Sequence, residues 1–577
     1  MYLLEKHTMK KIFNTLFICT LTLSLTAQKA KDSVSTEVVN VVTSYKPTIS
    51  DAFKANENPV IEKKVREKNN LKYNIKSTPI RSIFTPNPGG YKSAKIIKKT
   101  NGYQDYIKVG YGNYGTPFVE SFLYKRKNEH EAQFFLYNKA SSGGIDKVTL
   151  NNNYLNTKIE LNYKNTQKKQ SWETTIGYHR DQYNWYGIPS GYEQTVLNSI
   201  EEEQTYNQIF INGNIDLHRG NLKSVAASFS AFSDAFNSKE TAINITPSFE
   251  FPLKNNKIVT SFNLDILNGE FNKEYSSTTA INYGFLALGA HAYYPIQRDD
   301  LYLSIGAKVI YNSDLENNDN SFYAYPDIKI DYILIEALLS IYGGLTGGLI
   351  QNSYKNIASE NPYVSPTLEI KPTSNSINVF AGVKGKLTAS ISYDVKASYS
   401  KENDKLLFRS NQNLTNGSNT VNNGYEAGNS FYTIYDNVRI FDVFGKIKAI
   451  LTKNIATGAS LRFNSYSMDI EAEAWNLPPF TATIFGTYNY EKWSGKAELF
   501  AKGKRKDLLF AKDNTIETPV SIDGYLDLNL SANYAFTKKW SAFLELNNIF
   551  NKNYEVYSNY QVQGFQVLAG AIYSFDF

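Results

Sequence analysis

From about residue 104 to the end of the chain, apolar and polar side chains alternate with a period of two residues. In the stretch 525–536, leucines occupy one face while Asp527 and Asn529 occupy the other. The same division is found in residues 301–311, 389–400 and 480–490. Two is the period of a β-strand, whereas an amphipathic helix repeats every 3.6 residues. The sequence therefore predicts an all-β protein whose strands have one face for apolar surroundings and one for water.

A water-soluble β-sandwich or solenoid would also alternate, so composition is needed to separate the two classes. The chain contains 43 Tyr and 34 Phe but 5 Trp, and its mean hydropathy is −0.40. A transmembrane barrel presents only alternate residues to lipid, so its average stays polar while aromatic rings gather at the two bilayer interfaces. Beyond the N-terminal region, no stretch approaches the 18 apolar residues of a membrane helix. A chain of this kind crosses a membrane only as a closed barrel.

Connections of two lengths follow one another along the alternating region. Short polar turns are expected at residues 125–129, 166–169, 218–221, 254–256, 297–300, 452–454, 492–494 and 537–539. Long polar connections are expected at residues 184–202, 351–375, 402–428 and 503–523. Bacterial barrels have an even number of antiparallel strands, with short periplasmic turns and longer external loops. We therefore predict a transmembrane antiparallel up-and-down β-barrel over 104–577, with about 22 strands, every short turn inside and every long loop outside.

The N-terminus has the order of an export signal. Lys10 and Lys11 precede an apolar run that ends near Ala27, which predicts a signal peptide over 1–27. The one cysteine, Cys19, lies inside that run, so the mature chain would have no disulfide. A lipoprotein anchor at Cys19 is the alternative, but Phe17 and Ile18 stand where small residues would be needed.

The chain ends on an alternating aromatic strand. Tyr573, Phe575 and Phe577 share one face with smaller apolar residues, and the last residue is itself an apolar ring. Chain termini usually fray and seldom end in this way. The ending resembles the C-terminal signal by which the outer-membrane assembly machinery recognises unfolded barrels, and the resemblance implies that role for these three residues.

The last hundred residues carry a family resemblance. The stretch 525–554 reads YLDLNLSANYAFTKKWSAFLELNNIFNKNY and ends in the run NNIFNKNY at 547–554. This sequence is similar to the strands that precede the final strand in the TonB-dependent receptors. The resemblance implies a barrel of 22 strands in the cell outer membrane of a Gram-negative bacterium, embedded in outer-membrane lipid. It also implies receptor-like uptake of an unidentified substrate.

The N-terminal segment departs from that family. Residues 28–103 are too few and too poor in apolar side chains for the folded plug of those receptors, so we expect mostly extended chain and no complete plug domain. A valine-rich stretch at 37–43 resembles the TonB box, which adds a strand to the energy-coupling partner TonB through backbone hydrogen bonds. Its residues are Glu37, Val38, Val39, Val41, Val42 and Thr43. A remnant of a lost plug, or a strand lying against the barrel, are the alternatives.

A barrel of this size encloses a wide lumen, which related barrels keep plugged. Without a complete plug, the lumen needs another filling: inward folding of the long loops, the N-terminal segment, or a partner. Inward-facing residues such as Asp394, Lys396, Asp527 and Asn529 are expected to bond to whatever fills it.

The sequence shows no catalytic constellation, and we expect neither an enzyme nor a bound cofactor. The five histidines are scattered, and the basic residues behind the net charge of +6 are too dispersed for nucleic-acid binding. An oxygen-rich loop at 314–320 offers calcium ligands but lacks the glycine and terminal glutamate of a known calcium loop, which favours a solvated loop. Tyr183, Trp185 and Tyr186 suit either stacking on a flat ligand or, by preference, anchoring at the membrane interface.

Two functions remain open. In the first, the protein is a receptor-like transporter that uses TonB energy and contacts its substrate through the external loops. In the second, it is a non-transporting scaffold or accessory subunit of an outer-membrane complex, with the N-terminal segment reaching a periplasmic or lipoprotein partner. The family resemblance favours the first, and the missing plug favours the second.

Overall fold

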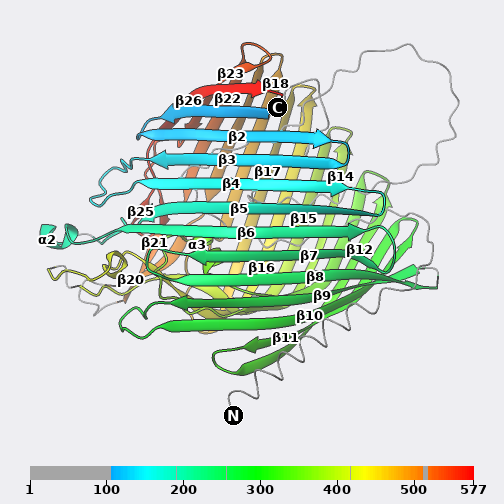
Figure 1. Cartoon of the computed structure of the whole chain (residues 1–577), viewed down its shortest axis with the longest axis horizontal. Helices are drawn as coiled ribbons and strands as arrows, with labels where there is room; N and C mark the ends of the chain where they lie inside the picture. Colours follow the sequence, from blue (N-terminus) through cyan, green and yellow to red (C-terminus); the bar gives the residue numbers. More distant parts are fainter. Residues whose placement is uncertain (1–104, 190, 255, 416–417, 511–516, 577) are drawn as a thin grey trace.

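The computed structural model describes residues 105–576 except 190, 255, 416–417 and 511–516, and within them 22 strands form one closed sheet (Figure 1). The predicted signal peptide, the segment 28–103 with its valine-rich stretch, and Phe577 lie outside the described residues. The prediction of an all-β, up-and-down barrel of 22 strands is confirmed.

The elements are bounded as follows. The barrel strands are β1 (Asp105–Gly112), β2 (Thr116–Lys127), β3 (His130–Ser141), β4 (Tyr154–Thr166), β5 (Gln170–Asn184), β6 (Glu203–Leu217), β7 (Leu222–Ser233), β8 (Lys239–Leu253), β9 (Asn256–Phe271), β10 (Ile281–Arg298), β11 (Leu301–Asp314), β12 (Asp319–Ile335), β13 (Leu339–Ile350), β14 (Thr373–Thr388), β15 (Ile391–Ser410), β16 (Phe431–Thr452), β17 (Ile455–Met468), β18 (Phe480–Tyr490), β19 (Trp493–Lys502), β22 (Tyr525–Ala535), β23 (Trp540–Asn547) and β26 (Gln566–Phe575). The connections hold two small hairpins and three short helices: β20 (Arg505–Phe510), β21 (Glu517–Ile522), β24 (Glu555–Tyr557), β25 (Tyr560–Gln561), α2 (Gln194–Leu197), α3 (Tyr354–Glu360) and the 3₁₀ turn η1 (Gly424–Glu426).

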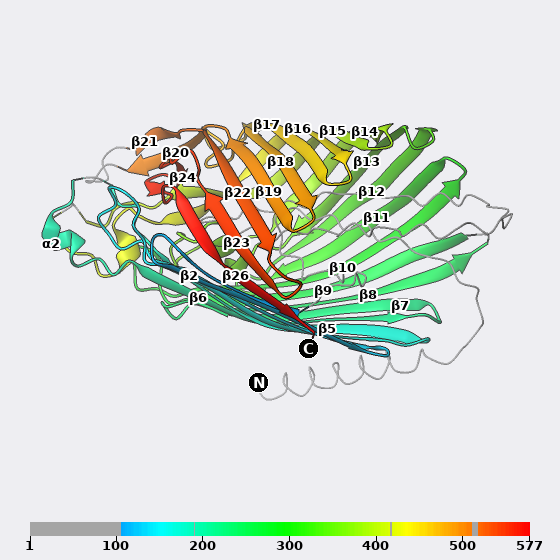
Figure 2. The same cartoon turned by 90° about the horizontal axis from the view of Figure 1, so that it is seen from above.

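The sheet closes between its first and last strands. β1 pairs antiparallel with β26, from Asp105 opposite Phe575 to Gly112 opposite Leu568. Every other barrel strand pairs with its neighbours along the chain, and the wall passes from β19 to β22 and from β23 to β26 because the small hairpins lie in the connections. Figure 2 shows this wall from above. The closed ring leaves no unpaired sheet edge, as a bilayer requires.

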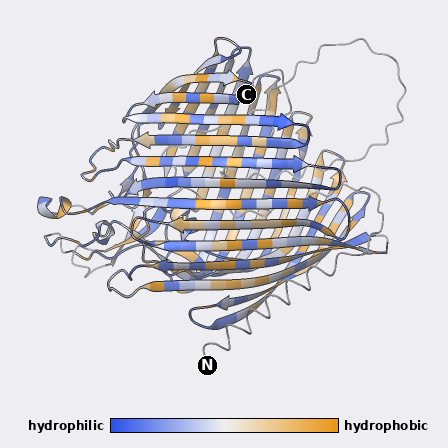
Figure 3. Ribbon diagram, in the orientation of Figure 1, coloured by the Kyte–Doolittle hydropathy of each residue, from blue (hydrophilic) through white to orange (hydrophobic). Residues whose placement is uncertain are grey.

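Hydrophilic and hydrophobic residues alternate along the strands (Figure 3), and many large apolar side chains of the barrel strands are exposed on the outside. In β22, the Leu530 side chain is 36% exposed on the outside, whereas Asp527 on the inner face is 1% exposed. Aromatic rings form pairs near the short-turn ends of the strands: Tyr163 with Trp172, Trp493 with Tyr534, and Trp540 with Tyr573. Such rings suit a membrane interface. No helix of the described residues is long and apolar enough to cross a membrane.

The inner face is polar and internally paired. The Lys108 ammonium contacts the Glu545 carboxylate at 2.5 Å and lies 4.1 Å from the centre of the Phe543 ring. Among the residues expected to face the lumen, Asp394 accepts a hydrogen bond from the Tyr342 hydroxyl at 2.5 Å. The Asn529 side chain accepts one from the backbone N–H of Asn548, in the last external connection. These groups therefore bond partly to the wall itself and partly to a loop.

The connections differ from the prediction in a few places. Residues 389–390 form a turn rather than part of a strand, and a further short turn at 336–338 was not predicted. β15 continues to Ser410, well beyond the expected loop start at 402, because a bulge between Glu402 and Lys405 absorbs the polar break and pairing then resumes.

The prediction that every short turn lies at the periplasmic end is wrong. Three brief connections, 113–115, 234–238 and 315–318, lie at the same end as the long loops. Residues with positive φ, Tyr114, Asn237 and Asn318, close these reversals. Strand parity, and not loop length, fixes the end at which a connection lies.

The outer face gives a test of membrane embedding. Leu530→Arg places a charge near the middle of β22 on the lipid side, and we expect it to lower the free energy of unfolding by about 2–4 kcal/mol. Ser531→Arg, one residue along on the water side, is the matched control and should cost much less. Denaturant titration of the barrel in lipid vesicles measures both. Equal losses would contradict the assigned faces.

Candidate functional site: an aromatic cap across the loop end

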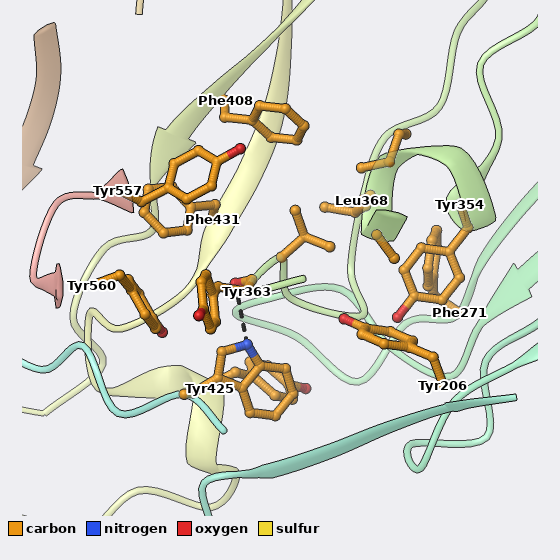
Figure 4. Packing of buried hydrophobic residues seen from close by; sticks show 14 of the residues in the cluster. Tyr206, Phe271, Tyr354, Tyr363, Leu368, Phe408, Tyr425, Phe431, Tyr557 and Tyr560 are labelled. Carbon is orange, nitrogen blue, oxygen red and sulfur yellow. Dashed lines mark hydrogen bonds between the residues drawn. The ribbon is translucent and has the colours of Figure 1, made fainter. Parts of the chain in front are cut away.

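Four long connections fold together at the loop end of the barrel, and we call this assembly the cap. They span residues 185–202, 351–372, 411–430 and 548–565. Their buried side chains form one hydrophobic cluster with residues at the strand ends, part of which is drawn in Figure 4. The members that dominate it are aromatic: Trp185, Tyr186, Tyr206, Phe232, Phe271, Tyr283, Tyr354, Tyr363, Phe408, Tyr425, Phe431, Tyr557 and Tyr560.

The cap reaches from one side of the barrel to the other. The cluster includes Tyr206, Phe232, Phe271 and Tyr283 from strands β6, β7, β9 and β10. It also includes Phe431 from β16. In a ring of 22 strands, β6 and β16 are far apart on the circumference. A single packed core that contacts both must therefore cross the mouth.

The centre of the cap is a loop segment with no exposed residue. All residues from 361 to 368 are buried, although loops usually run over the surface. The segment's backbone is paired by the surrounding aromatic side chains. The Trp185 indole donates to the Tyr363 carbonyl at 3.1 Å, and the Tyr206 hydroxyl donates to the Pro362 carbonyl at 2.9 Å. Pairing of this kind removes the cost of burying backbone polar groups.

A stack of rings and a strand-like pairing hold this segment on its other side. The Tyr363 and Tyr560 rings lie 3.7 Å apart between centroids at an angle of 22°. The backbone N–H of Phe431 donates to the Tyr363 carbonyl at 3.1 Å, and that of Ser365 donates to the Phe431 carbonyl at 2.9 Å. The segment 361–368 therefore links the connection 548–565 to the start of β16.

Two carboxylates fasten the helix α3, which precedes this segment, to the barrel wall. The Glu240 carboxylate accepts the backbone N–H groups of Tyr354 and Lys355 and the Tyr283 hydroxyl, the last at 2.9 Å. Asp234 accepts the Tyr354 hydroxyl at 2.7 Å, and burial raises the pKa of its carboxyl group. The cap is thus attached to the β7–β8 side of the wall by buried hydrogen bonds.

A small cavity lies beside the cap. It has a volume of about 50 Å³, and its polar lining comes from Glu360 at the end of α3, Asn476, Lys502 at the end of β19, and Arg505 at the start of β20. Desolvation raises the pKa of Glu360 to about 7. Next to this lining, burial raises the pKa of Asp507 to about 6, although that carboxylate accepts the Ser410 hydroxyl at 3.0 Å.

The structure places the residues that were singled out in the sequence in different surroundings. Trp185 and Tyr186 are buried in the cap, so the preferred assignment to the membrane interface is wrong, because the loop that carries them folds inward. Asp314 accepts the backbone N–H groups of Glu316 and Asn317 and so stabilises its own turn. Tyr573 and Phe575 lie in β26, where the structure does not test their role in assembly. The described residues contain no group of three potential metal ligands.

Little in the sequence indicates the cap. An aromatic run in a polar connection, at 183–186, was the one visible indication. Tyr363 and Tyr560 lie in connections whose fold depends on contacts between segments almost 200 positions apart, which no local period reveals.

The family model described as TonB dependent receptor-like, beta-barrel, matches residues 90–549. The chain belongs to this family. Its members are outer-membrane proteins, and this TonB-dependent receptor-like barrel is accordingly a protein of the outer membrane with a receptor-like role in uptake. Comparison with curated protein sequences finds no match.

Solved receptors share the barrel. The FrpB iron transporter from Neisseria meningitidis (F5-1 variant) is 11% identical, with a TM-score of 0.62 over 82% of this chain and 82% of that one. The pyoverdine receptor FpvA from Pseudomonas aeruginosa PAO1 is 13% identical, with a TM-score of 0.61 over 83% and 79%. The siderophore receptor PirA from Acinetobacter baumannii is 11% identical, with a TM-score of 0.59 over 82% and 80%. At these identities the likeness concerns the fold.

Removal of one ring should loosen the cap without harming the barrel. Tyr363→Ala deletes the central stack, and we expect a loss of about 3 kcal/mol in local stability, or about a hundredfold faster amide hydrogen exchange in residues 361–368. Phe322→Ala is the control, because that ring is 70% exposed on β12. Unchanged exchange in Tyr363→Ala would show that the cap does not depend on the stack.

The raised carboxyl pKa values predict a pH dependence of the cap. Glu360 and Asp507 bind protons more tightly in the closed cap than in an opened one, where their pKa values return toward 4.5 and 3.8. Cap stability should therefore be greatest at acid pH and fall as the pH rises through 6 and 7. Hydrogen exchange of residues 361–368, corrected for intrinsic rates, measures this.

A matched set of variants distinguishes the contribution of the Glu360 and Asp507 carboxyl groups from the pH dependence caused by other groups. The double variant Glu360→Gln with Asp507→Asn should weaken the pH dependence of cap stability, and the part that remains belongs to other buried carboxyl groups such as Asp234. Glu369→Gln, in the same connection but with an exposed carboxylate beside Lys371, should leave it unchanged. The same slope in all three proteins would assign the effect to other groups.

Proposed function

We propose that this barrel takes up a solute across the outer membrane with energy from TonB, and that the cap is the closed state of its outer gate. The main support for this proposal is the burial of the cap across the loop end of the barrel. The centre of the cap, the segment 361–368, is buried among residues of the connections and strand ends, and we infer that it closes the mouth. A receptor barrel needs such a barrier, because an open lumen of this width would leak.

The four connections of the cap can also move apart without breaking the barrel wall. The cap joins four connections of a sheet that is complete without them, since every barrel strand is paired with its two neighbours. Opening the cap therefore breaks loop contacts and leaves the wall intact. External loops are the segments through which we propose that a solute is first contacted.

We propose that the energy-coupling contact is the valine-rich stretch Glu37, Val38, Val39, Val41, Val42 and Thr43. Strand addition to TonB would use the backbone N–H and C=O groups of this stretch. We further infer that the chain has no catalytic role, in keeping with a family of receptors, and that Tyr573, Phe575 and Phe577 direct its assembly into the membrane.

A proline substitution tests the coupling contact. Val39→Pro removes a backbone donor and should abolish uptake if a strand forms there, whereas Val39→Thr keeps a strand-forming residue and should retain uptake. The readout is growth compared with a strain that lacks the gene, with barrel abundance in the outer membrane as the control. Wild-type growth with Val39→Pro would exclude energised uptake through this stretch.

A scaffold or accessory subunit of an outer-membrane complex is the second candidate. The compactness of the cap favours it, because a permanently closed barrel could serve only as a platform. Purification of the full chain from detergent-solubilised membranes distinguishes the two. Stoichiometric periplasmic or lipoprotein partners, together with normal growth of the Val39→Pro strain, would support the scaffold.

A further inference from the structure

A patch of exposed aliphatic side chains lies on the rim of the barrel opposite the cap. It surrounds three successive short turns, which join β12 to β13, β14 to β15 and β16 to β17. Its large members are between 48% and 61% exposed: Leu334, Ile335, Leu338, Leu387, Ile450 and Leu451. Exposed apolar patches mark surfaces that contact a membrane or another protein, whereas a rim surrounded by water carries polar residues.

Backbone hydrogen bonds join the three turns into one surface. The N–H of Lys386, near the end of β14, donates to the Ala337 carbonyl in the β12–β13 turn at 3.1 Å. The N–H of Ile450, near the end of β16, donates to the Ser390 carbonyl in the β14–β15 turn at 2.8 Å. The exposed aliphatic residues therefore belong to one hydrogen-bonded part of the wall and not to three separate loops.

The turns on the opposite side of the barrel are polar. Residues 125–130, between β2 and β3, and residues 166–170, between β4 and β5, are all charged or polar. Between β22 and β23, Lys538 and Lys539 stand beside Trp540, whose ring suits the headgroup region of a bilayer. Leucine and isoleucine, which make up the patch, prefer the acyl chains. The rim is therefore asymmetric in the surroundings that it suits.

The apolar outer face is also taller on the side of the patch. On β12 every second residue from Phe322 to Leu334 is apolar. At about 3.4 Å per residue and a tilt of about 40°, this run covers roughly 31 Å of height, against about 25 Å for the apolar band of an outer-membrane barrel. On β4 the run from Leu155 to Tyr163 covers roughly 21 Å by the same measure. A barrel that stood upright in the membrane would therefore leave the lower end of β12 outside the acyl chains.

We propose that the patch is immersed in the acyl chains of the inner leaflet, so that the barrel sits deeper in the membrane along β12–β17 than along β2–β5. The patch is continuous with the apolar outer face of the same strands, which lipid covers in an outer-membrane protein. Tilting costs little for a membrane protein whose apolar surface is taller than the bilayer. The charged residues of these turns, Glu336 and Lys453, are exposed and lie at the headgroups in this arrangement.

Depth-dependent fluorescence quenching tests the immersion, using the full chain in phosphatidylcholine vesicles that contain no other protein. Leu387→Cys and Leu451→Cys each carry a fluorophore in a Cys19→Ala background, because Cys19 is the one cysteine of the chain. Lys127→Cys and Thr166→Cys, at the ends of β2 and β4, are the matched controls. We expect nitroxides on the acyl chains to quench the two patch labels several-fold more strongly than the controls. Aqueous iodide should show the reverse order.

Equal access of iodide to the patch labels and the controls would overturn the proposal, and a periplasmic protein would then be the molecule that covers the patch. The inference does not depend on uptake, because a scaffold barrel would be immersed in the same way.

Urea titration in the same vesicles gives a second measurement that needs no label. Leu387→Asp should lower the midpoint of unfolding, because it places a carboxylate among acyl chains. Ala389→Asp adds the same charge at the tip of the same turn and should leave the midpoint unchanged. Equal midpoints for the two variants would also overturn the proposal.

Discussion

The structure depends on the pairing of β1 with β26. A bilayer offers no water to hydrogen-bond a sheet edge, so an open sheet of 22 strands would leave two rows of unpaired backbone groups in hydrocarbon. The pairing from Asp105 to Gly112 with the last strand removes both rows. Once the ring is closed, every barrel strand is paired on both sides without the help of the connections. They are then free to form a separate structure at the mouth.

That separate structure is a second core, made of loops and not of strands. Its polar backbone would oppose burial, but tyrosine and tryptophan side chains supply both an apolar ring and a hydrogen-bond donor. Tyr206 and Trp185 donate to carbonyl groups of the segment 361–368, while Tyr363 stacks on Tyr560. The high tyrosine content thus serves two purposes. Some rings face the membrane interface, and others donate hydrogen bonds to the backbone of a buried loop.

The cap has a buried aromatic centre and a margin of ionisable side chains. Around Tyr363, hydroxyl and indole groups pair with backbone carbonyls, and no charged side chain is required. Around Arg505, the buried side chains of Arg505 and Lys502 lie beside Glu360, whose pKa is raised by desolvation. Ionisation of Glu360 affects connections that also contribute to the aromatic centre. Both regions are joined through residues 548–565, which supply Tyr560 to the stack and two carbonyl groups to Arg505.

The sequence by itself determined the wall. A two-residue period, an even strand number and an apolar last strand predict a closed barrel of about 22 strands, because they depend only on near neighbours and on the requirement for paired edges. The tertiary structure alone decided the mouth. Trp185, Tyr363, Arg505 and Tyr560 lie in connections without any period, and they meet only because the closed ring brings distant strand ends together. Their burial arises from contacts between segments far apart in the chain, which local patterning does not encode.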